Sequence, residues 1–206
     1  MKSVYTAGFK LITALLLVIV SSSLMAKNST PATYVKPGID LSTYNKVMIK
    51  PLNMANIEVL KPAWEQDDSE EWVLQIEDVT VIQELFMDAM QSEIENKGGY
   101  AMVADPAADV LRIEVEVLSI TPYVKPGTPG NDGSFQIETL GSGDLVFSAE
   151  FRDSTTRELL VLIEGERPIG EKYRELSPEN HLKNVKSLFE KWGAKVRESL
   201  DAQHAK

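Results

Sequence analysis

The chain has 206 residues, a length at which one domain buries enough surface to fold without a metal or a disulfide. It contains no cysteine, which excludes disulfides, thiolate metal sites, cysteine nucleophiles and lipid attachment through cysteine. The formal net charge of −10 at pH 7 argues against nucleic acids and anionic lipids as partners, because both require a basic surface.

Residues 1–26 have the order of features that is typical of a secretory signal peptide. Two lysines precede an apolar run over residues 11–20, and small residues lead to Ala26. The run is shorter than the about 20 residues that span a bilayer. We therefore predict cleavage after Ala26, a periplasmic location and no stable membrane span in the mature protein. An uncleaved amino-terminal anchor is the alternative, because Leu24 is a poor residue at the third position before the cut.

The remaining chain is expected to form a flexible linker over residues 27–43, a single domain over residues 44–202 and a tail over residues 203–206. The domain opens with a short strand over residues 44–52, which Pro51 ends or confines to a sheet edge. The acidic stretch that follows, residues 53–77, is predicted to be a loop.

A first helix is expected after this loop. Thr80 and Gln83 have the spacing of a capping box, Asp78 is an alternative cap, and Gly98 and Gly99 end the helix. Its apolar stripe should lie on the sheet and consists of Ile82, Leu85, Phe86, Ala89 and Met90. A short strand is predicted over residues 100–103.

The stretch at residues 110–122, VLRIEVEVLSITP, is predicted to be the central strand. Apolar side chains alternate with charged ones over residues 111–117, which indicates one dry face and one wet face. A mobile loop rich in glycine and proline is expected over residues 122–143. Two further strands, residues 145–152 and 159–164, are separated by a polar turn and predict an antiparallel hairpin.

The last predicted element is a long amphipathic helix with a well-defined start. Ser177 is the expected cap and Pro178 occupies the first helical position. The apolar face consists of Leu182, Val185, Phe189, Trp192, Val196 and Leu200. Because this face must be buried, Trp192→Ala should be severely destabilising. Together the elements predict an α+β two-layer sandwich, with a mixed, mostly antiparallel sheet of about four to five strands and two long helices on one face.

Signals for catalysis are scarce. The two histidines, His181 at a helix start and His204 in the tail, have no companion at a metal-binding spacing, and no nucleophile-elbow or phosphate-binding motif occurs. We therefore predict no enzyme activity, no catalytic residue, no metal and no cofactor. An enzyme would require two of four carboxylates to converge in a closed pocket, and these are Glu114, Glu116, Glu150 and Asp153.

Two features stand out as candidates for partner binding. Trp64 and Trp72 lie in the acidic loop, where aromatic residues are favoured at protein interfaces, although either one could instead fold back onto the core. The pentapeptide YVKPG occurs at residues 34–38 and again at 123–127, and Pro-Gly favours a type II turn. The candidate partner-binding residues are Trp64, Trp72, Asp67, Asp68 and Tyr123. The acidic residues lack the alternating spacing and the mid-loop glycine of a calcium loop.

Four segments resemble, in order, the exported bacterial proteins grouped as domain of unknown function 3313. These are YVKPGIDLSTYNKVMIKPL at residues 34–52, LRIEVEVLSITP at 111–122, AEFRDSTTRELL at 149–160 and the closing helix. Because members are typically predicted lipoproteins of Gram-negative envelopes, the resemblance implies a cell-envelope location. The chain departs from that pattern at Ala26, where lipid attachment would require a cysteine.

These observations favour an exported, non-enzymatic module that binds another envelope protein through the acidic tryptophan loop. The alternative is a small-molecule or glycan binder that uses Trp64, Trp72 and the loop over residues 122–143. The sequence leaves the oligomeric state open.

Overall fold

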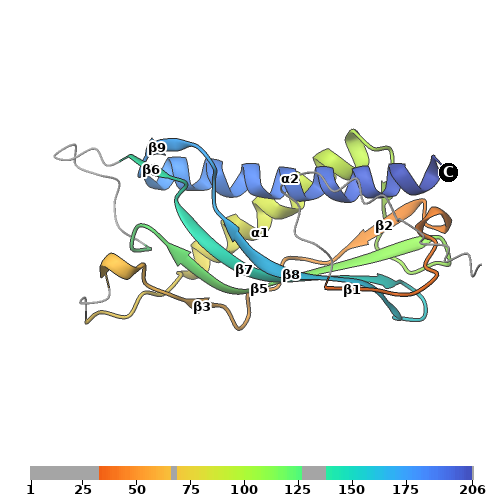
Figure 1. The fold of residues 1–206 in the computed structure, drawn as a ribbon, viewed down its shortest axis with the longest axis horizontal. Helices are drawn as coiled ribbons and strands as arrows, with labels where there is room; N and C mark the ends of the chain where they lie inside the picture. The colour runs from red at the N-terminus through yellow and green to blue at the C-terminus, as the bar shows by residue number, and fades with distance from the viewer. Residues whose placement is uncertain (1–32, 66–68, 127–137, 206) are drawn as a thin grey trace, which may run out of the picture.

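Two helices cover one face of a mixed β-sheet, as the computed structural model shows (Figure 1). The structure describes residues 33–65, 69–126 and 138–205. The helices are α1 (Ile76–Met90), which continues as one π-helical segment η3 (Gln91–Asn96), and α2 (Pro178–His204). Two short 3-10 helices are η1 (Leu41–Thr43) and η2 (Ala63–Glu65). This arrangement confirms the predicted α+β class with both helices on one side.

Within the described residues, the main sheet has seven strands, more than the about four to five predicted. Six strands follow the order β1-β8-β7-β5-β2-β4, β3 also pairs with β5, and β6 and β9 form a separate two-stranded sheet. The bounds are β1 (Tyr34–Val35), β2 (Lys46–Ile49), β3 (Glu58–Val59), β4 (Ala101–Met102), β5 (Val110–Pro122), β6 (Glu138–Leu140), β7 (Gly143–Asp153), β8 (Leu159–Pro168) and β9 (Tyr173–Glu175). The extra strands have only two or three residues, too few to produce a periodic pattern.

The long strand β5 is the centre of the sheet, as predicted. It pairs antiparallel with β7 on one side and parallel with β2 and β3 on the other. Leu111, Ile113, Val115 and Val117 face the core, and the register with β7 then shifts between Val117 and Ser119. This bulge leaves Leu118 42% exposed and turns Ile120 and Pro122 inward.

Helix α1 begins earlier than the sequence predicts. Its N-cap is Gln75, and the Asp78 carboxylate accepts a hydrogen bond from the Gln75 backbone N–H at 3.1 Å. Thr80 is already inside the helix and donates its hydroxyl to the Ile76 carbonyl oxygen. The predicted stop is confirmed, because Gly99 adopts a φ of +75°, which costs glycine little.

Helix α2 begins as predicted and joins α1 through aromatic packing. The Ser177 hydroxyl accepts a hydrogen bond from the Asn180 N–H, and Pro178 is the first helical residue. Phe86 of α1 and Phe189 of α2 are fully buried and meet edge to face, with ring centroids 5.4 Å apart. This pair lies at the centre of the core between the helices.

The two ends of the domain are more ordered than the sequence predicts. The expected linker over residues 27–43 is structured from Tyr34 onward, because β1 pairs with β8. The expected tail begins too early, because α2 continues to His204. The Nε2 atom of His204 lies 2.9 Å from the Tyr44 carbonyl oxygen. This hydrogen bond and a ring contact between His204 and Tyr100 hold the end of the chain in the helix.

Candidate binding site

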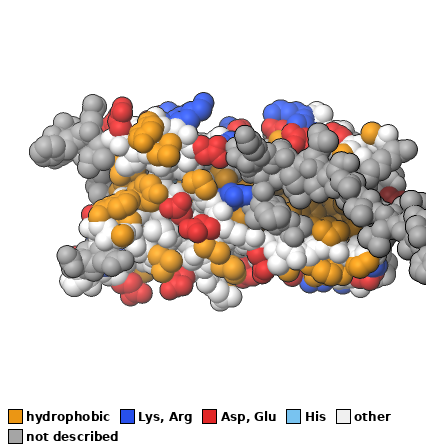
Figure 2. All heavy atoms as spheres, in the orientation of Figure 1, with side chains coloured by type: hydrophobic (Ala, Val, Ile, Leu, Met, Phe, Trp, Pro, Cys, Tyr) orange, Lys and Arg blue, Asp and Glu red, His pale blue; other side chains and the backbone are white. Residues whose placement is uncertain are grey.

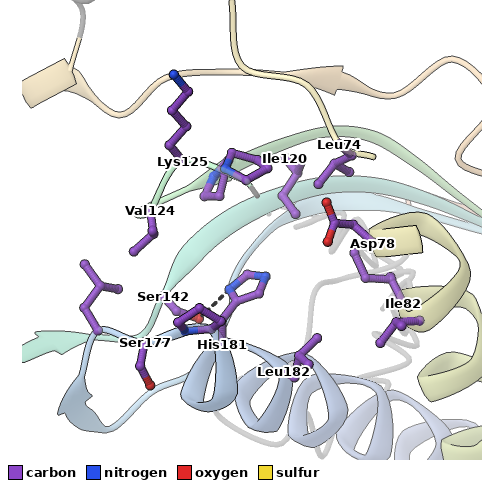
Figure 3. A pocket seen from close by; sticks show the side chains of 15 residues that line it. Leu74, Asp78, Ile82, Ile120, Val124, Lys125, Ser142, Ser177, His181 and Leu182 are labelled. Atoms are coloured by element: carbon purple, nitrogen blue, oxygen red, sulfur yellow. Dashed lines mark hydrogen bonds between the residues drawn. The ribbon is translucent and has the colours of Figure 1, made fainter. Parts of the chain in front are cut away.

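Both helices begin at the end of the fold where β5 ends (Figure 1). A pocket opens there (Figure 3). Its volume is about 270 Å³. The walls are mainly apolar and are formed by Leu74, Val81, Ile82, Ile120, Pro122, Val124, Pro126, Leu176, Pro178 and Leu182. The polar side chains in the lining are Asp78, Lys125, Ser142, Ser177 and His181.

Four separate segments bring these side chains together, and Ser142, just before β7, is one of them. The bulge in β5 turns Ile120 and Pro122 toward the helices, and the chain after β5 adds Val124 and Lys125. Both helices contribute their first turns, in which capping places short polar residues such as Ser177. The core therefore ends in a recess at this point.

One polar cluster forms part of the pocket wall around Ser142, which is 3% exposed. The Ser142 Oγ lies 3.0 Å from His181 Nδ1, accepts a hydrogen bond from Asn184 Nδ2 at 3.2 Å and donates one to the Ile169 carbonyl oxygen at 3.2 Å. A serine hydroxyl has a single proton, so donation to Ile169 requires that His181 donate from Nδ1. This tautomer satisfies all three contacts and leaves a lone pair on Nε2.

The Nε2 atom of His181 points into the pocket (Figure 3). Within residues 33–65, 69–126 and 138–205 it has no hydrogen-bond partner. Burial lowers the pKa of His181 below its usual 6.5, against the opposing effects of the Ser142 contact and the negative charge of Asp78. The imidazole is therefore neutral at pH 7, and Nε2 is a hydrogen-bond acceptor.

The two charged side chains of the pocket have opposite signs and come from different elements. Asp78 belongs to the first turn of α1, where its carboxylate caps the helix, and Lys125 forms an ion pair with Glu70. The pocket therefore carries no large charge of one sign.

An aromatic pair joins η2 to the segment that follows β5. Trp64 in η2 is 60% exposed and packs edge to face against Tyr123, with centroids 5.1 Å apart. The Tyr123 hydroxyl donates a hydrogen bond to Asp144 at 3.0 Å. Burial, with this contact to a carboxylate, raises the pKa of Tyr123. The Tyr123 ring thus holds the Trp64 side chain in place, while most of the Trp64 ring remains exposed to solvent.

The structure separates the two tryptophans that the sequence grouped together. Trp72 is 4% exposed, so its side chain is not available on the surface, which corrects the expectation that both tryptophans face a partner. Trp72 folds back onto the core, which is the alternative for either tryptophan, whereas Trp64 and Tyr123 meet at the surface. Asp67 and Asp68 lie outside the described residues, as does most of the glycine-rich loop after residue 126.

The two copies of the YVKPG pentapeptide have different surroundings. In the first copy, Tyr34 pairs with Leu162 in the sheet and Gly38 adopts a φ of +71°, as the predicted turn requires. In the second copy, Tyr123 packs against Trp64. The repeat therefore does not create two equivalent binding loops.

Three of the four carboxylates that an enzyme would need, Glu114, Glu116 and Glu150, lie on the face of the sheet opposite the helices. Glu114 and Glu150 are directly opposite each other and form ion pairs with Arg112 and Arg152. Together with Glu116 they line a shallow depression, and Asp153 is not part of it. Among the residues that the structure describes, no group of three or more His, Cys, Asp or Glu side chains is arranged to hold a metal ion.

Asp153 instead connects two of the four segments on which the family resemblance rests, residues 34–52 and 149–160. Its carboxylate accepts a hydrogen bond from the Tyr44 hydroxyl at 3.0 Å and others from the backbone N–H groups of Thr155 and Thr156. The family model described as "Protein of unknown function (DUF3313)" matches residues 19–196. The chain belongs to the DUF3313 family. None of the curated proteins compared with this DUF3313 chain matches it.

Several solved structures are similar to this DUF3313 protein at low sequence identity. A PelC dodecamer from Paraburkholderia phytofirmans, in a variant with one substitution, has 10% identity and a TM-score of 0.36, covering 79% of this chain and 93% of that one. A DUF330 protein from Xanthomonas campestris has 10% identity and a TM-score of 0.43, covering 82% and 94%. A minor lipoprotein from Acinetobacter baumannii has 11% identity and a TM-score of 0.34, covering 76% and 94%.

Within the described residues of the DUF3313 chain, no helix combines the length and the apolarity that crossing a membrane requires.

The sequence analysis singled out Trp64 and Tyr123 but missed the pocket and His181. One signal was available, because His181 lies four residues before Val185 and so shares the buried face of α2.

Proposed function

We propose that this DUF3313 protein is an exported, non-enzymatic accessory module of the bacterial cell envelope that binds another envelope protein. The binding surface is the end of the fold that carries Trp64, Tyr123 and the pocket. The signal-peptide pattern of residues 1–26 supports export.

The single observation that carries the proposal is the exposure of Trp64. A tryptophan that is 60% exposed yet fixed by a ring contact loses little side-chain freedom on binding and buries a large apolar area. Other apolar side chains at this end of the molecule are also exposed, including Ile76 at 76% and Tyr173 at 72%. The space-filling view shows hydrophobic side chains gathered toward this end (Figure 2).

Other observations support a binding role over catalysis. Ser142 is buried, and its hydroxyl is engaged by three groups, so the Ser142–His181 pair offers no accessible nucleophile. Glu114 and Glu150 are paired with arginines on an open face instead of a water-excluding pocket.

The test is photo-crosslinking in the native bacterium from a reactive amino acid at position 64. We expect one dominant envelope protein among the products, and the same reactive residue at exposed Glu198, in the last turns of α2, should not capture it. Trp64→Ala should abolish co-purification of this partner without a large change in melting temperature. Equal products from positions 64 and 198 would contradict the proposal.

The pocket favours a second candidate function, binding of a small molecule or a glycan, because a recess with apolar walls and a few polar groups is typical of ligand sites. A melting-temperature screen with cell-wall fragments and sugars tests it. A flat result across these compounds would count against this second function.

A further inference from the structure

The pocket contains a hydrogen-bond acceptor, His181 Nε2, that has no donor among the described residues and faces mainly apolar walls. The Ser142 network fixes the Nδ1–H tautomer of His181, so Nε2 presents a lone pair toward the cavity (Figure 3). An apolar occupant would cut this acceptor off from water without replacing its hydrogen bond, so an occupant that brings a hydrogen-bond donor is favoured over a purely apolar one.

The charges in the lining favour neither sign of occupant, because Asp78 and Lys125 carry opposite charges. An ionic group would lose its hydration against the apolar walls without a net attraction to offset that cost. The occupant that fits best is therefore neutral, apolar in its body, and carries an N–H or O–H group.

The size of the pocket points to a single side chain. Its volume of about 270 Å³ is below the roughly 300–1,000 Å³ typical of sites that enclose a whole small ligand. Its rim includes Val81 and Leu182, which are 37% and 39% exposed and offer further apolar contact outside the recess. An anchor residue of a protein partner uses both features, since the rest of the partner covers the rim.

The pocket and the Trp64–Tyr123 pair share one short segment of the chain. Pro122, Val124 and Lys125 line the pocket, while Tyr123, between them in the chain, contacts Trp64. A partner broad enough to cover this end of the fold would contact both.

We propose that the pocket receives one tryptophan or tyrosine side chain of the partner protein, whose indole N–H or phenol O–H donates a hydrogen bond to His181 Nε2. This inference rests on the proposed protein-binding function and identifies the residue type by which the partner is recognised.

Indole and 1-methylindole form a matched pair of probes, because they share a ring system and only indole has the N–H donor. Binding is measured by NMR on the purified protein with ¹⁵N-labelled histidine. We expect indole to bind about 2- to 10-fold more tightly than 1-methylindole, the ratio that one net hydrogen bond supplies, and to shift the Nε2 resonance of His181.

His181→Phe keeps a ring in place and removes the acceptor, so the preference for indole should disappear. His204→Phe, at the opposite end of α2, is the control and should retain the preference. A preference that survives in His181→Phe, or no saturable binding of indole at millimolar concentration, would overturn the proposal. Tighter binding of octanol than of indole would also overturn it in favour of a free aliphatic ligand.

Crosslinking from position 64 in the His181→Phe background separates this inference from the proposed function. Loss of the product with an unchanged melting temperature supports the anchor residue. A product that forms as in the wild type leaves the protein-binding function standing and overturns the assignment of the pocket. If the wild type itself gives no product, the partner and its anchor residue are both rejected, whatever the indole result.

Discussion

Replacing the two tryptophans by alanine should have opposite consequences, because one side chain is buried and the other is on the surface. Trp72 is 4% exposed, and removing a fully buried tryptophan side chain costs about 3–5 kcal/mol in the free energy of unfolding. For a domain of this size that corresponds to a fall of roughly 6–20 °C in melting temperature. Trp64 is 60% exposed, and its loss removes mainly the ring contact with Tyr123, about 1 kcal/mol.

Urea unfolding followed by far-UV circular dichroism is the appropriate assay, because each substitution removes a fluorophore. Trp72→Phe is the matched variant and should recover much of the stability, since it restores most of the buried ring. If Trp72→Ala and Trp64→Ala lower the free energy of unfolding by the same amount, the burial of Trp72 is wrong. In that case both tryptophans return as candidates for the partner surface.

Three further predictions concern the supports of the fold. Burial, and then hydrogen bonds to Asp153 and Asp201, raise the pKa values of Tyr44 and Tyr100 to about 12. The unfolded chain therefore loses these protons at a lower pH than the folded protein, so the free energy of unfolding should fall as the pH rises from 10 to 12. Urea midpoints across this pH range, together with a titration of tyrosine absorbance at 295 nm, check this prediction. Ser177→Ala removes the cap of α2 and should cost about 1 kcal/mol in urea unfolding, whereas no change would mean that the cap contributes nothing. Trp192→Ala should cost near the lower end of about 3–5 kcal/mol, because the half-buried ring packs 4.5 Å from that of Phe147; a loss below 1 kcal/mol would show that this packing is unimportant.

The sequence predicts those parts of the fold in which a hydrophobic pattern repeats over many residues. Strands β5 and β7 and helix α2 each repeat their pattern over enough residues to fix both the element and its buried face. The β5 bulge breaks the pattern, yet it leaves a trace, because Ile120 follows Val117 by three positions instead of an even number. Strands β1 and β3 have two residues each and exist only because the longer strands β8 and β5 offer them an edge.

The candidate site was only partly predictable because its components depend on contacts between distant segments. Nothing local distinguishes Trp64 from Trp72, since both lie among acidic residues, and only their tertiary neighbours decide which is buried. His181 has no companion at a metal-binding spacing in the sequence, and its partner Ser142 is 39 positions away. The predicted apolar face of α2 began at Leu182, whereas that side chain is 39% exposed and lines the pocket.

The position of the pocket follows from a conflict between capping a helix and filling a core. The first turn of a helix must satisfy backbone N–H groups, which favours Ser177, Pro178 and Asp78 over large apolar side chains. In this fold both helices begin at the same end of the sheet (Figure 1), so two capping turns coincide and neither fills the space above Ile120. The recess is thus a consequence of the helix starts, and an aromatic side chain from a partner would complete the core there.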